Sequence, residues 1–365
     1  MRETTMSVES LKQFMSACFR SVGVPESDVA IIVDVLIRSD LRGIESHGIG
    51  RLKMYIDRIR TGIIEPVTRW EIVRESAGSA LIDGRNGMGH VISYHAMNLA
   101  MQKARQTGVA AVSVANSSHF GIAGYYPLMA AAQDMAGLAV TNARPSIAPT
   151  FGCDPMLGTN PIAFAVPTDE ACPFVLDMAT SIVQRGKIEV LDREAKPVPP
   201  GLAVDRSGQD VLDAPQLLKM FGQKAASLLP LGGLGETHAG YKGYGLAMMV
   251  EILSAAFSAG PFCWGVSGVD ENGKNIPHRL GHFFLAMDIS HFVDVQTFKK
   301  ITGDLVREMR ASAKLPGQER IYTAGEKEYL KEQTIPRTGV PLNAELQKMM
   351  KQLNEELGLK MSLPF

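Results

Sequence analysis

The sequence predicts an α/β protein that opens with a helical region. Apolar residues recur at helical spacing as far as residue 60, and from Trp70 onward short strand candidates alternate with helical patterns. The chain has 365 residues, of which 45% are hydrophobic and 21% charged, so it can bury a sizeable core. This length predicts on the order of two to three domains.

Three helices are expected in the opening region. Ser7 can cap a helix over Val8–Arg20, and a second helix begins at Pro25 and extends to about residue 42. A third helix is expected over Glu45–Arg60, because leucine, isoleucine and tyrosine side chains recur on one of its faces.

The rest of the chain has the pattern of a sheet with helices between its strands. Strands are expected at Glu71–Arg74, Ala80–Asp83, Val109–Ala115, Gly137–Thr141, Ile162–Val166, Phe174–Asp177 and Phe283–Ile289. Helices are expected at Val91–Thr107, Gly124–Asp134 and Tyr244–Ser258. We interpret Lys196–Gly208 as a surface excursion, and the tail from Asp294 as charged helix broken by Pro336 and Pro341.

Composition excludes several classes of protein. Lys and Arg total 37 and Asp and Glu total 38, whereas a nucleic-acid-binding protein needs a basic surplus to contact phosphates. No apolar run approaches the roughly 18 residues of a membrane span, and the N-terminus has no signal-like apolar segment. The four cysteines are dispersed, which favours reduced thiols over a disulfide framework or zinc ribbon. We therefore expect a cytoplasmic protein that binds neither nucleic acid nor membrane, with no metal site.

Two glycine clusters resemble part of a dinucleotide-binding fingerprint. Each of them, Gly87–Ile92 and Gly233–His238, lacks the third glycine that close helix packing requires. No acidic residue follows the first cluster at the spacing that would place a carboxylate on the cofactor ribose. The alternative interpretation is that these glycines form tight turns.

Two histidines are candidate catalytic residues. On the predicted third helix, His47 and Arg51 are four residues apart and project from one face, which suits a site that holds a carboxylate and moves a proton. His119 follows a buried strand, where α/β proteins commonly place their chemistry. The alternatives are an exposed amphipathic helix face for the first histidine and a structural role for the second.

Five ordered motifs resemble those of the type-2 malate/L-lactate dehydrogenases, and most closely the malate dehydrogenase branch. They are Glu45–Gly48 with Arg51, Asn116–Gly121, Gly158–Pro161, Leu176–Ser181 and Gly240–Gly245. The resemblance extends from about Ser7 to about Leu359. It implies that NAD or NADP is bound without a Rossmann fold, on an α/β domain with a largely antiparallel sheet.

The resemblance also implies a domain division and an assembly. A helical domain would comprise residues 1–72 together with returning C-terminal segments, about 330–365. The α/β cofactor-binding and catalytic domain would then comprise residues 73–329. Members of the family form homodimers, so a homodimer is expected.

Individual site residues follow from the same resemblance. His47 matches the proton donor of some members and His119 that of others. The substrate would be bound by Ser46, Arg51, Arg144 and Thr159. The cofactor would be bound by Val175, Leu176, Asp177, Met178, Ala179, Thr180, Ser181, Tyr241, Lys242, Ala324, Gly325 and Glu326. The last three stand in Thr323-Ala324-Gly325-Glu326, where many relatives have Pro-Gly-Glu.

The expected activity is that of an NAD(P)-dependent oxidoreductase that interconverts an (S)-2-hydroxy acid and its 2-oxo acid, with malate favoured over lactate and similar acids. Such chemistry needs a cation for the carboxylate, a hydride from the cofactor, and an acid near pKa 6.5, the ordinary value of histidine. Two alternatives remain open. One is a reductase of a cyclic imine carboxylate in the same family, and the other is a non-catalytic ligand-binding protein on this fold.

Overall fold

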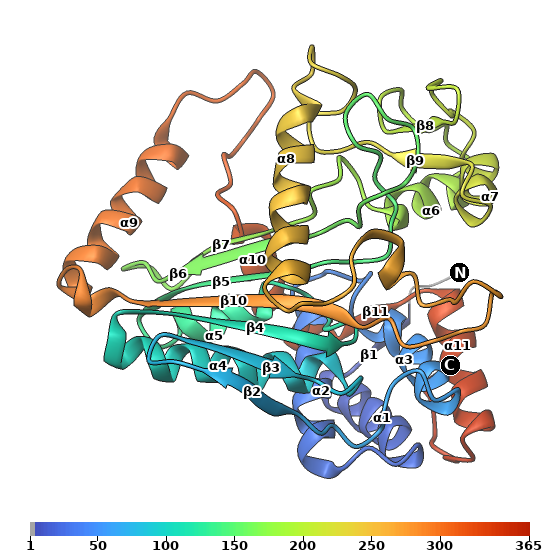
Figure 1. The fold of residues 1–365 in the computed structure, drawn as a ribbon, viewed down its shortest axis with the longest axis horizontal. Coiled ribbons are helices and arrows are strands. Elements are labelled where there is room, and N and C mark those ends of the chain that lie inside the picture. Colours follow the sequence, from blue (N-terminus) through green and yellow to red (C-terminus); the bar gives the residue numbers. More distant parts are fainter. Residues whose placement is uncertain (1–3) are drawn as a thin grey trace.

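The computed structural model describes residues 4–365 and begins with a helical region (Figure 1). Its helices are α1 (Val8–Ser21), α2 (Glu26–Leu41) and α3 (Leu52–Arg60). The Ser7 hydroxyl accepts a hydrogen bond from the Ser10 backbone N–H, so the predicted cap of α1 is confirmed. The predicted third helix is shorter than expected, because residues 45–51 form a turn and a single 3₁₀ turn instead.

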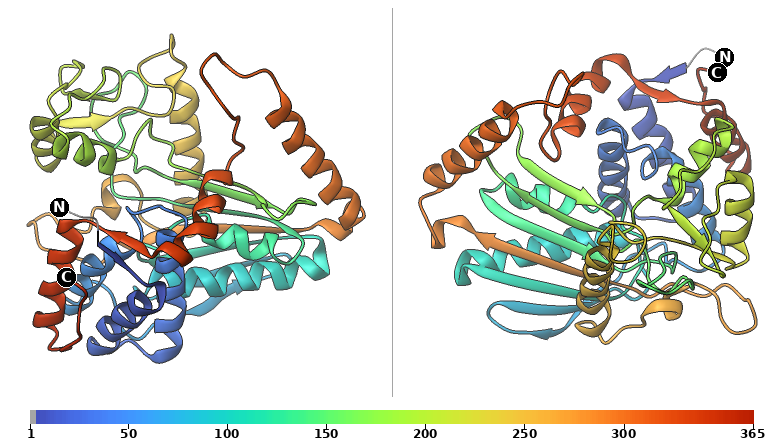
Figure 2. Two further views of the ribbon diagram at one scale, coloured as in Figure 1. Left: turned by 180° about the vertical axis from the view of Figure 1, so that it is seen from behind. Right: turned by 90° about the horizontal axis from the view of Figure 1, so that it is seen from above.

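A seven-stranded sheet forms the centre of the molecule. Its strands, in spatial order, are β2 (Glu71–Glu75), β3 (Ser79–Asp83), β4 (Val109–Ser117), β10 (Leu280–Asp288), β5 (Met135–Thr141), β6 (Ile162–Val166) and β7 (Phe174–Met178). Only the β3–β4 pair is parallel, and the other five pairs are antiparallel. The mixed α/β class is therefore confirmed, and all seven predicted strands form this one sheet (Figure 2).

Helices cover both faces of the sheet. On one face lie α4 (Gly89–Thr107) and α5 (Tyr125–Ala131), and on the other stands α8 (Gly240–Glu251), which continues into a π-helical turn at Ile252–Ala256 (Figure 1). Alanines and methionines of α4, among them Ala96, Met97 and Ala100, are buried in one core with the β4 and β10 side chains. This packing fixes the ends of β4 and β5, from which two loops of the site emerge.

A small unit stands beside this sheet and was not predicted. It consists of α6 (Arg185–Arg193), β8 (Ala203–Asp205), α7 (Ala214–Gly222) and β9 (Ala226–Leu228). Ile188, Leu217 and Leu228 belong to its separate hydrophobic core. The interpretation of Lys196–Gly208 as only a surface excursion is thus corrected, because β8 lies within that stretch and pairs with β9.

The last three elements of the chain return to the helical region. They are α10 (Glu326–Thr338), β11 (Val340–Leu342) and α11 (Ala344–Glu356), and they follow α9 (Val295–Ala311), which stands away from that region (Figure 1). Strand β11 pairs with β1 (Thr4–Met6), and Met350 and Leu353 of α11 share a core with α1 and α2. The domain boundaries near residues 72 and 330 remain a prediction.

One detail of the tail is wrong. Pro336 does not break the helix, since it lies in the last turn of α10, where only one backbone hydrogen bond is lost with its missing N–H. Across residues 4–365, no helix has the length and apolar character to cross a bilayer.

Candidate active site

A cavity of about 600 Å³ lies where the helical region meets the loops that follow β4, β5 and β7. Its lining includes all six residues predicted to act on the substrate. They are Ser46, His47, Arg51, His119, Arg144 and Thr159. Residues more than 100 positions apart in the sequence thus face one space, which is the observation on which the functional argument rests.

His47 is held by a turn and does not lie on a helix, which corrects the sequence-based placement. The buried Asp40 carboxylate accepts the backbone N–H of Ile49 at 2.9 Å, and this bond draws the chain away from helical geometry. Gly48 passes so close that a Cβ there would lie 1.9 Å from the Asp40 Oδ1 atom. Despite the turn, His47 and Arg51 both reach the cavity.

The loop that carries His119 is fixed by the first glycine cluster. The Ser118 hydroxyl donates to the Gly87 carbonyl at 3.0 Å and accepts the Gly89 N–H at 2.9 Å. A Cβ on Gly89 would lie 2.1 Å from the Ser118 carbonyl oxygen. The tight-turn interpretation of Gly87–Gly89 is therefore the correct one, since these glycines position the loop that carries His119 by close backbone approach.

The two candidate histidines are neighbours. Their rings are stacked, with centroids 5.5 Å apart and planes inclined by 25°. His47 Nδ1 lies 2.8 Å from the Ser46 hydroxyl, and His119 Nδ1 lies 2.5 Å from the Tyr55 hydroxyl. The Gly121 backbone N–H also points at His119 Nδ1, at 3.3 Å. Because a backbone N–H can only donate, His119 Nδ1 is an acceptor, and the neutral ring carries its proton on Nε2.

Burial makes both histidines neutral at pH 7. Burial, and secondarily the Arg51 cation, lower the pKa of His47 to about 4. Burial also lowers the pKa of His119 well below its ordinary value, with a further contribution from His47. The expectation of an acid near pKa 6.5 is therefore not met without a ligand. A bound carboxylate next to Arg51 would offset that cation and raise the pKa of His47.

The sequence analysis did not name two residues of α3 that belong to the site. Tyr55 is fully buried and holds His119, while Arg58 lines the cavity from the same helix. The signal was present, because Arg51, Tyr55 and Arg58 follow one another at intervals of four and three residues and so share one helix face.

Half of the predicted cofactor residues border the same region. A second cavity of about 350 Å³ is lined by Val175, Leu176, Asp177, Ala324 and Gly325. It shares Ile44, Asp177 and Glu328 with the larger cavity, which Ala179 also lines.

Strand β7 and the turn at Ala324–Gly325 are held in close contact. The Val175 N–H donates to the Ala324 carbonyl at 3.2 Å. Gly325 has a φ of 84°, and a Cβ there would lie 2.7 Å from the Val175 Cβ. Only glycine fits this left-handed position against β7.

Other predicted cofactor residues lie outside both linings. Met178 ends β7, and the Thr180 hydroxyl is bound to the Asn160 carbonyl at 3.0 Å. Ser181 is buried, and its hydroxyl has no partner among residues 4–365. Glu326 is buried and forms ion pairs with arginines of neighbouring segments.

Tyr241 and Lys242 lie in the first turn of α8, away from both cavities. Tyr241 is 47% exposed, and the Lys242 ammonium lies 5.9 Å from its ring centroid. Within one copy of the chain, the structure does not bring these two residues to the rest of the predicted site, and their role remains a prediction.

Comparison with known proteins gives consistent matches over the whole chain. The family model described as malate/L-lactate dehydrogenase matches residues 6–351. A malate dehydrogenase of Pyrococcus horikoshii is 43% identical over 347 residues, covering 95% of this chain and 93% of the relative. A malate/(S)-sulfolactate dehydrogenase of Methanothermus fervidus is 35% identical, covering 98% and 99%. The crystal structure of a malate dehydrogenase from Entamoeba histolytica superposes with a TM-score of 0.95 at 42% identity and covers 100% of both chains.

Proposed function

The chain belongs to the malate/L-lactate dehydrogenase family, and from that premise we propose that it interconverts an (S)-2-hydroxy acid and its 2-oxo acid with NAD or NADP. Malate is the favoured hydroxy acid. The observation that carries the proposal is the convergence of two stacked histidines and Arg51 on one cavity.

The residues present fit a nicotinamide cofactor. Two adjoining cavities with a shared wall offer an elongated space, and Gly325 lets the tail segment approach β7 closely. Val175–Ser181 and Ala324–Gly325 would hold the cofactor on this largely antiparallel, non-Rossmann sheet. When bound, the nicotinamide supplies the hydride in one direction and accepts it in the other.

Arg51 would bind the substrate carboxylate. Its Nε donates to the Ser46 carbonyl at 2.6 Å, which fixes the guanidinium on the turn that carries His47. The remaining guanidinium N–H groups match the geometry of a carboxylate. The 2-oxo group, attached to the carbon next to that carboxylate, would then lie beside the two imidazoles.

His47 would transfer the proton. The carboxylate bound at Arg51 offsets the cation that lowers the His47 pKa, so the substrate itself favours the protonated ring. His119 would donate a hydrogen bond from its Nε2–H, because Tyr55 and Gly121 fix this tautomer. In the oxidative direction the neutral His47 accepts the hydroxyl proton, so both directions use the same atoms.

A homodimer is the proposed assembly. Helix α9 stands away from the body of the chain (Figure 2) and exposes Ile301, Leu305 and Met309 at four-residue spacing, with exposed fractions of 60%, 56% and 50%. An apolar stripe of this kind is typical of a protein contact. We further propose a cytoplasmic location, since the four cysteines of the described chain are free thiols.

The test is a panel of carbonyl substrates with NADH and with NADPH, followed by the loss of nicotinamide absorbance. Oxaloacetate, pyruvate and other 2-oxo acids represent the proposed function, and a cyclic imine carboxylate represents the alternative reductase. Turnover of the 2-oxo acids, fastest with oxaloacetate, supports the proposal. If only the cyclic imine carboxylate is reduced, the protein is the alternative reductase. If no compound is reduced, the result favours a non-catalytic ligand-binding protein.

A further inference from the structure

The large cavity has a pronounced excess of positive charge. Five cationic side chains line it against the two carboxyl groups of Asp177 and Glu328. Two of the five have partners, since Lys224 lies 4.1 Å from the Trp264 ring centroid and Arg185 pairs with Glu189. The other three are Arg51, Arg58 and Arg144. We call these three the cavity arginines.

None of the cavity arginines forms an ion pair within residues 4–365. Arg51 donates only to a backbone carbonyl, and no hydrogen bond from the Arg58 or Arg144 side chain is present in that range. Burial lowers the pKa of Arg58, and the neighbouring Arg51 and Arg144 charges lower it further. Three guanidinium groups thus face one space, and the charged form of Arg58 is disfavoured there.

Arg60 shows how an arginine of the same helix behaves when it is structural. It is exposed and pairs with Glu356 of α11 at 3.3 Å. Arg58, only two residues earlier, is half-buried and turned toward the cavity. The difference between the two is that Arg58, unlike Arg60, has no anionic partner among residues 4–365.

One substrate carboxylate does not account for this arrangement. Arg51 is enough to bind the acidic group next to the reacting carbonyl. Arg58 lies on α3, seven residues after Arg51 of the preceding 3₁₀ turn, which places the two Cα atoms on the order of 10 Å apart. Long side chains reaching inward from these two positions suit a ligand with an acidic group at each end.

We propose that Arg58, supported by Arg144, binds the second acidic group of a dianionic 2-oxo acid and thereby sets the preference for diacids over monoacids. The second group would be a carboxylate or a sulfonate separated from the first carboxylate by two carbon atoms. This inference rests on the proposed function and adds to it the residue that determines specificity.

The main competing ligand for Arg58 is a cofactor phosphate. Arg58 and Arg51 both contribute to the low pKa of His119, and Arg58 and Arg144 to that of His278, so these arginines surround the imidazole end of the cavity. The tail segment with Ala324 and Gly325 borders the other cavity. The position of Arg58 therefore favours the substrate over the phosphates.

The experiment compares Arg58→Met with the matched control Arg60→Met. Each protein is assayed with oxaloacetate, sulfopyruvate, pyruvate and 2-oxobutyrate. For Arg58→Met we expect kcat/KM for the two diacids to fall by about 10- to 150-fold, mainly through KM, as for a lost hydrogen bond to a charged group. Pyruvate and 2-oxobutyrate should change by less than about threefold, and Arg60→Met should match the parent for all four acids.

Several results would overturn the inference. Equal losses for diacids and monoacids would make Arg58 a general part of the site, and unchanged diacid kinetics would remove it from the site. If Arg58→Met binds NADH or NADPH more weakly than the parent in the absence of substrate, as measured by nicotinamide fluorescence, Arg58 contacts the cofactor phosphates.

Failure of this inference can be distinguished from failure of the proposed function and from misfolding of the variant. If the parent reduces no 2-oxo acid, the proposed function itself is wrong, whatever Arg58 does. If Arg58→Met does not fold by circular dichroism, Arg58→Lys replaces it. The lysine keeps the charge but not the planar fork, so a selective rise in KM for the diacids is again expected.

Discussion

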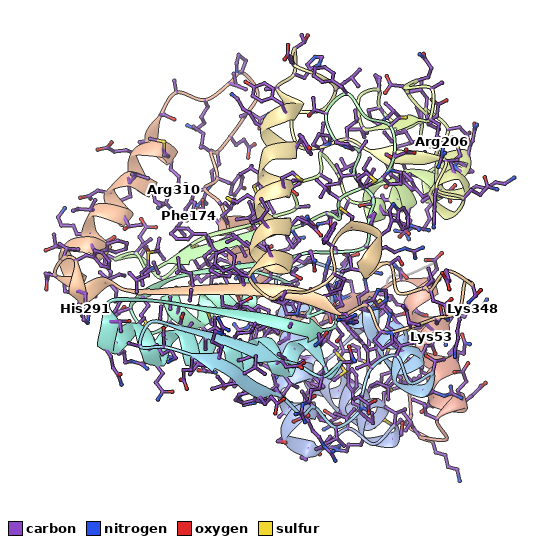
Figure 3. The ribbon with its side chains drawn as sticks, in the orientation of Figure 1. Lys53, Phe174, Arg206, His291, Arg310 and Lys348 are labelled. Atoms are coloured by element: carbon purple, nitrogen blue, oxygen red, sulfur yellow. The ribbon has the colours of Figure 1, made fainter. Side chains whose placement is uncertain are left out.

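Two groups of arginines in this molecule have opposite surroundings. The cavity arginines have no acidic partner within residues 4–365. By contrast, Arg307, Arg310 and Arg320, here called the arm arginines, lie on α9 and on the loop that leads to α10. Figure 3 labels Arg310 on α9 and Phe174, the first residue of β7.

Each arm arginine has a carboxylate partner. Arg307 pairs with Asp169 at 2.8 Å, Arg310 pairs with Glu170 at 2.5 Å, and Arg320 pairs with Glu326. The first two pairs fasten α9 to the turn between β6 and β7, and the third joins the loop after α9 to the start of α10. The arm arginines therefore have a structural role.

The pKa directions express the same difference. Hydrogen-bonded carboxylates raise the pKa of Arg307 and of Arg310, whereas burial and neighbouring cations lower that of Arg58. A cation left partly desolvated beside other cations is destabilising unless a ligand compensates it. The comparison teaches that cationic side chains without an acidic partner in a cavity indicate a site for an anionic ligand. Cationic side chains that are paired with carboxylates indicate a structural role.

The largest effect is expected at His47. We predict that His47→Gln lowers turnover about 10²- to 10⁴-fold, because general acid–base transfer is lost, while the cofactor Kd stays close to that of the parent. Steady-state kinetics and a cofactor titration check both parts. If the variant turns over substrate as fast as the parent, the role of proton donor belongs to His119 instead of His47.

A smaller effect is expected at Arg51, where a lysine variant tests whether the shape of the guanidinium group or only its charge is needed. We predict that Arg51→Lys raises the KM for 2-oxo acids almost as much as Arg51→Met does, by about 10- to 150-fold, because lysine lacks the planar fork. The same exchange at the exposed, paired Arg307 should leave KM unchanged. A parent-like KM in Arg51→Lys would exclude a bidentate contact.

The third prediction concerns the charge on His47. Because the pKa of His47 is lowered to about 4, its ring is protonated below that pH and neutral above it. Arg51→Met removes the second cause of the shift, so the titration should move toward higher pH. NMR of isotope-labelled histidine, assigned with His47→Gln, measures both values. A parent titration near 6.5, the ordinary histidine value, would show that burial and Arg51 do not act as described.

The smallest effect is expected for the arm arginines. Arg307→Met breaks exposed ion pairs, which contribute little to stability in water. We predict unchanged kcat/KM and a slightly lower thermal midpoint, with the difference shrinking at high salt. A large loss of activity with retained stability would contradict the structural role.

Much of the fold could be predicted because its strands are apolar runs with clear ends. Strand β6 has the predicted bounds, Ile162–Val166, and α2 begins directly after Pro25 as expected. The unit around β8 and β9 was missed, because its three-residue strands depend on pairing between distant segments and carry little local pattern.

The site was predictable in content but not in geometry. The motifs supplied the residues that meet in the cavity, whereas the turn at His47 depends on Asp40, a contact that no helical period reveals. Arg58 was overlooked although its spacing from Arg51 was visible, because nothing in the sequence shows that a cation lacks a partner.

The most direct measurement is a calorimetric titration of an unreactive dianion, succinate, whose carboxylates are separated by two carbon atoms, into the enzyme with its reduced cofactor bound. We predict that the parent and Arg307→Met bind it equally, and that Arg51→Met binds it about 10- to 150-fold more weakly. Equal dissociation constants for the parent and Arg51→Met would contradict the claim that the cavity arginines are unpaired because they receive an anionic substrate.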